Sequence, residues 1–162
     1  PFDDEFVELV NPTDDRLDLT AVRLIESGEE VTNLEGVCLA PETAVVIFGG
    51  SADASSPKLP GGVRTMVSPQ RFGFANSGGS FRVVSSDGGK FATIDWSSAP
   101  AESYTLSPQI EGESYRPHSE LQSSKTMSPG RCADGSPLEG GCPPASLTDA
   151  GDAIGDGSDT AP

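Results

Sequence analysis

Basic residues are scarce in this 162-residue chain, which carries ten Lys and Arg against 25 Asp and Glu and has a net charge of −15 at pH 7. A protein that binds nucleic acid needs clustered cations to displace counterions from phosphate. The ten cations here are spread along the sequence, which argues against direct binding to DNA, RNA or anionic lipid. We interpret the excess of acidic residues as a source of solubility rather than as an acidic binding patch.

Long apolar runs are also missing. The longest covers residues 44–48, whereas a membrane helix needs roughly 20 apolar residues. The 19 Gly and 14 Pro leave little room for long helices. Apolar residues make up 35% of the chain, enough for one modest core. The first residue is Pro1, and we expect the chain to be a processed product or a fragment of a longer protein.

Histidine occurs once, as His118, in a polar segment after a proline. A serine hydrolase needs a nucleophile, a base and an orienting acid, and no Gly-x-Ser-x-Gly elbow accompanies this histidine. We therefore expect His118 to make hydrogen bonds at the surface or between strands. A glycosidase would need two carboxylates facing a cleft, but the early acidic residues are interpreted as a solvated edge with turn caps: Asp3, Asp4, Glu5, Glu8, Asp14, Asp15 and Asp18. The sequence predicts no enzyme.

Cysteine occurs three times. Cys132 and Cys142 flank a short Gly- and Pro-rich stretch, and we predict a disulfide between them, worth about 2–3 kcal/mol in the chain-entropy model. Such a bond indicates an oxidising compartment. Cys38 lies between apolar neighbours and is predicted to be a small buried residue. A zinc site is the alternative, but the spacing contains no CxxC pair.

The last twenty residues, 143–162, contain no Lys or Arg and are rich in Gly, Ser, Thr and Ala. Such a composition cannot bury enough apolar area to offset the entropy of ordering, so it predicts a disordered acidic tail or linker after a domain at residues 1–142. Calcium is the more plausible metal for oxygen-rich loops, but the tail aspartates are loosely spaced and form no known calcium loop: Asp149, Asp152, Asp156 and Asp159. We predict no metal site and no cofactor.

Short extended segments separated by Gly, Pro, Asn and Asp dominate the rest of the chain. They indicate about nine short strands and no helix, which is typical of an antiparallel β-sandwich or barrel. Residues 44–48, AVVIF, lack polar alternation and should be buried on both faces. The clearest hairpin is FRVVSSDGGKFATIDW at 81–96. The expected strands, together with shorter extended pieces, are 5–10, 17–19, 22–25, 31–34, 37–39, 44–48, 63–67, 71–75, 81–84, 91–96 and 104–106.

Four stretches, taken in order, resemble the lamin tail domain family. EFVELVNPTDDRLDLTAVRL at 5–24 is similar to its opening strand and Asn-Pro turn, and LAPETAVVIFGG at 39–50 to its Leu-x-Pro turn and apolar strand. FGFANSGGSFRVVSSDGG at 72–89 resembles its Asn-x-Gly turn and strand pair. The stretch at 103–135, with Ser-Pro-Gly, is similar to the ending of bacterial members. The resemblance covers roughly residues 5–135.

The chain departs from the family at Ala21-Val22, where members commonly carry Gly-Trp, so packing near this pair should differ. The resemblance implies an immunoglobulin-like antiparallel β-sandwich. Residues 107–129 are polar and broken by prolines, so we expect them to form irregular coil against it. Bacterial members resemble accessory modules of exported or cell-surface proteins, and fold alone does not fix function.

We therefore expect a non-catalytic binding or scaffolding module that is secreted, periplasmic or on the cell surface, with a protein or glycan partner. The alternative is an accessory domain of an exported hydrolase, such as a nuclease, with its catalytic domain elsewhere. The long polar segment at 51–62 and the segment at 107–129 are the expected contact surface, because long loops are often functional.

Overall fold

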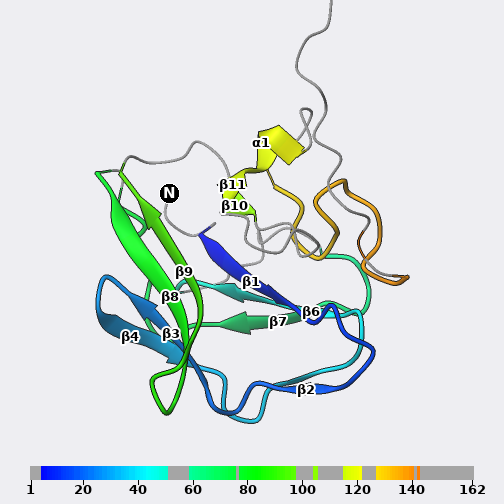
Figure 1. Ribbon diagram of the computed structural model, residues 1–162, viewed down its shortest axis with the longest axis horizontal. Coiled ribbons are helices and arrows are strands. Elements are labelled where there is room, and N and C mark those ends of the chain that lie inside the picture. The colour runs from blue at the N-terminus through cyan, green and yellow to red at the C-terminus, as the bar shows by residue number, and fades with distance from the viewer. Residues whose placement is uncertain are drawn as a thin grey trace, which may run out of the picture.

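The computed structural model describes residues 5–50, 59–75, 77–97, 104–105, 115–121, 127–140 and 142. Within them the chain forms short strands and a single helical turn (Figure 1). The strands are β1 (Phe6–Val10), β2 (Leu17–Asp18), β3 (Val22–Glu26), β4 (Glu29–Asn33), β5 (Cys38–Leu39), β6 (Ala44–Phe48), β7 (Arg64–Val67), β8 (Gly79–Ser85), β9 (Lys90–Trp96), β10 (Tyr104–Thr105) and β11 (Arg116–Pro117), and the helical turn is α1 (His118–Leu121).

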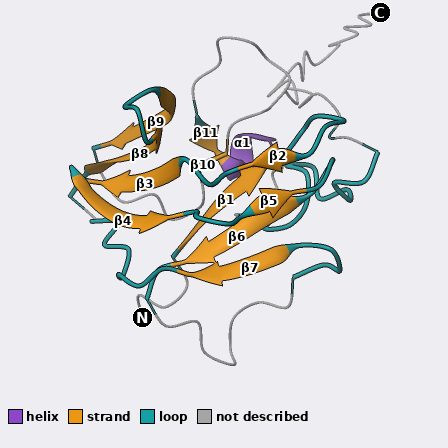
Figure 2. Ribbon diagram, turned by 90° about the horizontal axis from the view of Figure 1, so that it is seen from below, coloured by secondary structure: helices purple, strands orange, loops and turns teal. Residues whose placement is uncertain are grey.

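Two sheets carry the architecture. One has the order β4-β3-β8-β9 and the other β1-β6-β7, with β2-β5 and β10-β11 as two short pairs (Figure 2). The pairing is antiparallel throughout the described part except between β6 and β7, which run parallel. The predicted all-β fold class is therefore confirmed, with one parallel pair that the sequence pattern did not indicate.

One apolar core lies between the two larger sheets. Val45 and Ile47 of β6 belong to the same buried cluster as Leu24 of β3 and Phe81 of β8. Fully burying a side chain of this size stabilises the fold by about 1.5–3 kcal/mol. Because both sheets contribute to a shared cluster, they pack face to face as layers of a sandwich.

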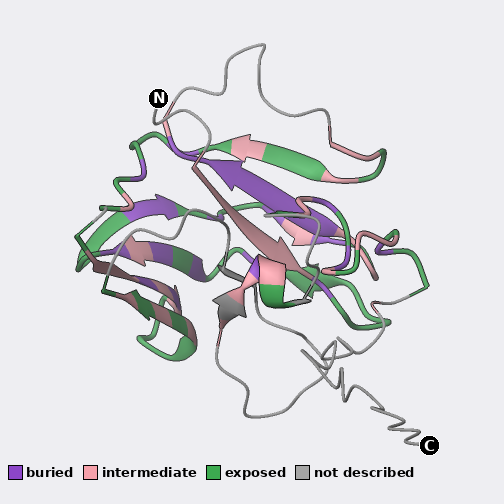
Figure 3. Ribbon diagram, turned by 90° about the horizontal axis from the view of Figure 1, so that it is seen from above, coloured by how far each residue is buried: buried purple, intermediate pink, exposed green. Residues whose placement is uncertain are grey.

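Strand β6 is buried along its whole length (Figure 3). It lies between β1 and β7 in its sheet, and the ring of Phe48 packs beside that of Phe6 with centroids 6.2 Å apart. This confirms the prediction that the most apolar run of the sequence is covered on both faces.

The hairpin of β8 and β9 forms where the sequence predicts it. The N–H of Ser85 donates to the carbonyl of Gly89 at 2.7 Å, which closes the turn. At the far end of the hairpin Gly79 pairs with Trp96, and a Cβ on Gly79 would lie 2.6 Å from the indole ring. The indole N–H donates to the carbonyl of Ala75 at 3.0 Å. Because Gly79 has no side chain, the indole ring of Trp96 can pack directly against its backbone on the sheet.

The sequence-based prediction is wrong in two places. Residues 71–75 are not a strand: Phe72 and Phe74 alternate as in a strand, but the N–H of Gly73 between them donates to the carboxylate of Glu26 instead of to a neighbouring strand. Residues 118–121 form α1 although no helix was predicted, and with β11 they give regular structure to part of a segment expected to be irregular.

The described residues include no helix long and apolar enough to cross a bilayer. Residues 143–162, predicted to be a tail or linker, lie outside the described residues, so the domain boundary at residue 142 stays a prediction.

Candidate functional site

The single histidine lies in α1, and its side chain is completely buried. A general base must reach a proton on a bound substrate, and His118 in this position presents no imidazole surface to solvent. The burial excludes the surface position that the sequence allowed, and the structural role expected for His118 stays a prediction.

Metal-binding side chains do not converge in the part of the chain that the structure describes: it contains no group of three or more His, Cys, Asp or Glu residues arranged to hold an ion. The four tail aspartates considered for calcium lie outside the described residues. The absence of a metal site therefore stays a prediction.

Three glutamates are more buried than the sequence suggested. Glu5 and Glu8 were expected at a solvated edge, but burial raises the pKa of both, that of Glu8 to about 7. Burial also raises the pKa of Glu26, and the charge of Glu26 contributes to the raised pKa of Glu5. Each accepts a hydrogen bond from a backbone N–H: Glu5 from Phe74, Glu8 from Gly130 and Glu26 from Gly73. These carboxylates hold distant segments together.

The predicted disulfide is present. Cys132 and Cys142 are joined with a Cα–Cα distance of 5.2 Å, and Cys132 is buried. Cys38 is a free thiol in β5 opposite Asp18, and it is only partly buried, contrary to the expectation of a fully buried side chain.

The two segments expected to form a contact surface are described only in part. Of residues 51–62 the structure describes 59–62, and of residues 107–129 it describes 115–121 and 127–129. The described pieces of the second segment include the buried His118. The prediction that these loops form the contact surface stays open.

An open hollow of about 560 Å³, lined mainly by polar residues, lies over the β3–β4 hairpin, and we call it the β3–β4 hollow. Strands β3 and β4 pair antiparallel and supply its floor, while the turn between β8 and β9 closes one side, where the N–H of Ser86 donates to the carbonyl of Ala21 at 2.7 Å. The hollow is lined by Asp18, Thr20, Ala21, Arg23, Glu30, Asn33, Glu35 and Ser86.

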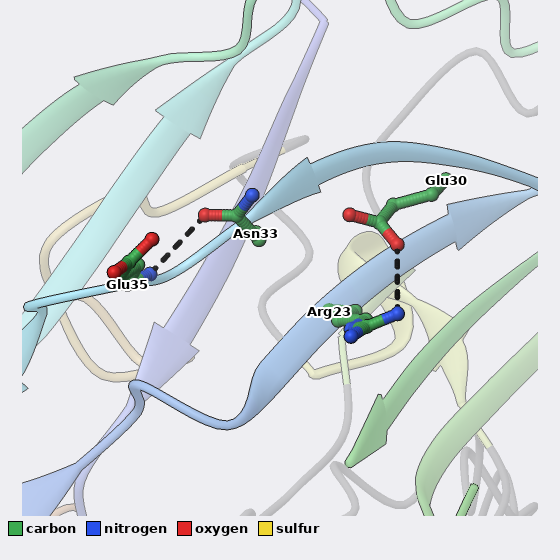
Figure 4. Close-up of polar contacts among 4 residues, drawn as sticks. All are labelled: Arg23, Glu30, Asn33 and Glu35. Carbon is green, nitrogen blue, oxygen red and sulfur yellow. Dashed lines mark hydrogen bonds and ion pairs between the residues drawn. The ribbon is translucent and has the colours of Figure 1, made fainter. Parts of the chain in front are cut away.

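Charged side chains in the hollow remain accessible. Arg23 and Glu30 form an ion pair across the two strands at 3.3 Å, with side chains 47% and 40% exposed (Figure 4). An exposed pair of this kind contributes little to stability, about 0–1 kcal/mol. The N–H of Glu35 donates to the side-chain oxygen of Asn33 at 3.3 Å, which holds the start of the following turn (Figure 4).

The hollow is negative overall, because three carboxylates face one guanidinium. Hydrogen bonds from the hydroxyl and N–H of Thr20 lower the pKa of Asp18, which keeps that carboxylate ionised. No aromatic side chain is among the residues that line the hollow. Its chemistry suits a hydrophilic partner that presents cations or hydroxyl groups.

Sequence reasoning missed this hollow because its residues come from three stretches of the chain, at 18–23, 30–35 and 86, which strand pairing brings together. No local pattern indicated the hollow: Ala21 lines it, while its neighbour Val22 is buried in the core.

The chain matches no protein-family model, and none of the curated protein sequences is significantly similar to it.

Proposed function

We propose that this protein is a non-catalytic binding or scaffolding module that works outside the cytoplasm, and that the β3–β4 hollow is part of its contact surface. The observation that carries the proposal is the hollow itself. It is wide and open, and ionised and amide side chains line it. A small-molecule site is usually a concave, mostly apolar pocket that encloses its ligand. An open polar surface fits the rim of a macromolecular interface better.

Charge indicates the kind of partner. The hollow carries three carboxylates and one guanidinium. Complementary charge accelerates encounter and selects partners. A partner protein that presents Lys or Arg is therefore favoured over an acidic one.

The disulfide supports action in an oxidising compartment, because such bonds are rare where thiols are kept reduced. The sequence resemblance to lamin tail domains, with its implied immunoglobulin-like topology and its bacterial exported members, points the same way. The alternative role, as accessory domain of an exported hydrolase, rests on that resemblance. The full open reading frame would distinguish the two, since a neighbouring catalytic domain favours the alternative.

The proposal is tested by titrating the ¹⁵N-labelled protein with a tetralysine peptide and, separately, with tetraglutamate. We expect tetralysine to shift the backbone signals of Arg23, Glu30 and Glu35, and tetraglutamate to leave them in place. The double variant Glu30→Lys/Glu35→Lys should lose the response.

The matched control is Glu29→Lys, which reverses a charge on the same strand at a residue that does not line the hollow. This variant should respond as the wild type does. Shifts spread evenly over the acidic surface, or an equal loss of response in the control, would contradict a specific contact surface at the hollow.

A further inference from the structure

The C-terminal part of the described chain forms a compact loop closed on itself by the disulfide. We call residues 127–140 together with Cys142 the clasp. Its turns are held by backbone bonds, among them the N–H of Arg131 to the carbonyl of Ser128 at 3.0 Å and the N–H of Gly135 to the carbonyl of Cys132 at 2.8 Å. Both sulfur atoms belong to the clasp, so the disulfide does not tie it covalently to either sheet.

The clasp lies on one end of the three-stranded sheet. Cys132 and Leu138 are buried together with Ala44, the first residue of β6, and the partly buried residues packed against them include Val10, the last residue of β1, and Val63, just before β7. The clasp therefore covers the end of the sheet where β1 stops and β6 and β7 begin, in agreement with its position at the start of β6 in Figure 1.

Two carboxylates hold the clasp, one just before the disulfide loop and one within it. Glu8 in β1 accepts from the N–H of Gly130 at 2.7 Å, and Glu42, just before β6, accepts from the N–H of Gly140 at 3.0 Å. Gly130 has a φ of +74°, and a Cβ there would lie 2.8 Å from Val63. The clasp thus comes too close to the sheet at this point for any side chain.

These contacts depend on the clasp keeping its shape. The disulfide closes residues 132–142 into one loop, which carries Gly140 and follows directly after Gly130, so that both carboxylates can be engaged at once. Without the bond, the loop between Cys132 and Cys142 must be closed at an entropic cost that corresponds to a factor on the order of 100 in the docking equilibrium. The contacts of the described clasp residues with the sheet include apolar side chains and the two hydrogen bonds.

We propose that the clasp is a redox-dependent cover: it stays docked while the Cys132–Cys142 bond is intact, and a dithiol reductant releases it while the two-sheet core stays folded. Release uncovers the apolar end of the sheet formed by Val10, Ala44 and Val63.

A dithiol supplies the two electrons that reduce the Cys132–Cys142 disulfide by thiol–disulfide exchange. One thiolate of the reductant attacks the sulfur of Cys142, since Cys142 is the less buried of the two residues, and the sulfur–sulfur bond breaks with Cys132 leaving as thiolate. The second thiol of the reductant then closes the reductant's own disulfide and releases Cys142. The two protein sulfurs take up protons to become thiols, and the reductant is oxidised.

The test compares the oxidised protein, the protein kept in dithiothreitol, and the double variant Cys132→Ala/Cys142→Ala. Hydrogen exchange at Gly130 and Gly140 reports docking, because their N–H groups are bonded to Glu8 and Glu42. Tryptic cleavage at the exposed Arg131 is a second reporter. The single tryptophan, Trp96, lies in β9 of the other sheet, so its emission reports the core independently.

We expect exchange at Gly130 and Gly140 and cleavage at Arg131 to accelerate on the order of 100-fold on reduction and in the double variant, with Trp96 emission unchanged. Cys38→Ala is the matched control, since it removes a thiol from β5 outside the clasp and should leave both reporters as in the wild type.

Two outcomes would overturn the proposal. If the reduced protein kept the exchange rates of the oxidised one, docking would not depend on the disulfide. If Trp96 emission changed together with the clasp reporters, the disulfide would be holding the whole fold rather than a separable cover.

Discussion

The carboxylate of Glu8 accepts a hydrogen bond of 2.7 Å from the backbone N–H of Gly130, a residue 122 positions away in the chain. Glu8 lies in the middle of β1, so this one contact joins the first strand to the last described segment. Burial at this place raises the pKa of Glu8 to about 7, although the hydrogen bond from Gly130 acts in the opposite direction. Desolvation therefore outweighs the bond, and the carboxyl is partly protonated near neutral pH.

This pKa predicts that acidification stabilises the protein. Because the folded state holds the proton of Glu8 more tightly than the unfolded chain does, the free energy of unfolding should fall as the pH rises from 4.5 to about 7. Glu8→Gln keeps an oxygen acceptor for Gly130 but carries no charge. We expect it to raise the free energy of unfolding at pH 8 by on the order of 3 kcal/mol, measured by urea denaturation.

The same variant supplies its own control at low pH. At pH 4 the carboxyl of wild-type Glu8 is protonated in both states, so wild type and Glu8→Gln should unfold at nearly the same urea concentration. A constant difference between the two proteins at pH 4 and pH 8 would mean that the ionisation of Glu8 does not contribute.

The sequence could predict the parts of the fold that local patterns determine. The run of apolar residues at 44–48 indicated the central strand, and Ser-Asp-Gly-Gly between two alternating segments indicated the β8–β9 hairpin. It could not predict contacts whose two members lie far apart. Phe72-Gly73-Phe74 has the alternation of a strand, but the carboxylate of Glu26, 47 positions before Gly73, takes the hydrogen bond that a neighbouring strand would have made.

Glu26 gives a second prediction, because both of its oxygens lie 3.0 Å from the N–H of Gly73. Glu26→Ala removes the acceptor and leaves a partly buried N–H without one, which should lower the free energy of unfolding by about 1–3 kcal/mol. Glu26→Gln retains an acceptor oxygen. Since burial raises the pKa of Glu26, this variant should lose nothing at pH 8. Equal destabilisation by both substitutions, measured by urea denaturation, would contradict the role of the acceptor.

Gly79 gives a third prediction, since a Cβ there would lie 2.6 Å from the ring of Trp96. Gly79→Ala should displace the indole from its hydrogen bond with Ala75 and destabilise the protein by about 1–3 kcal/mol through overpacking. Trp96 emission should shift to the red in the folded variant. Gly61→Ala is the control, because nothing lies within 4 Å of a Cβ at that position; it should leave the emission unchanged. If the emission spectrum of Gly79→Ala matched that of the wild type, the indole ring of Trp96 would not pack against Gly79.

The candidate site, like residues 71–75, was harder to predict than the rest of the fold because it depends on contacts that the local residue pattern does not determine. Arg23 and Glu30 meet because β3 and β4 pair in a particular register, with an irregularity between Leu24 and Ile25. Neither the register nor the irregularity can be predicted from the local residue pattern. The disulfide was predictable because its two cysteines are close in sequence, whereas its packing against Ala44 was not.

The last prediction concerns Asn11, which is fully buried at the end of β1. Its amide donates to the carbonyls of Asp15 at 2.8 Å and Ala40 at 3.0 Å, and its side-chain oxygen accepts from the N–H of Thr13 at 3.1 Å. Asn11→Asp keeps the size of the side chain but replaces the donor with an oxygen that faces carbonyl oxygens, so it should destabilise the protein by on the order of 3 kcal/mol at pH 7.

Protonation gives that carboxyl a donor again, so the cost of Asn11→Asp should be smaller at pH 4 than at pH 7. Asn33→Asp is the matched control: Asn33 is exposed, and its side-chain oxygen, which accepts from Glu35, is retained in the variant. Chemical denaturation of both variants at the two pH values separates the effects. If Asn11→Asp cost no more than Asn33→Asp, the turn after β1 would be held by its backbone alone. A large, pH-dependent destabilisation by Asn11→Asp alone would instead show that the buried amide of Asn11 fixes this turn. Only a group that both donates and accepts hydrogen bonds can bond to Ala40 and Thr13 at the same time.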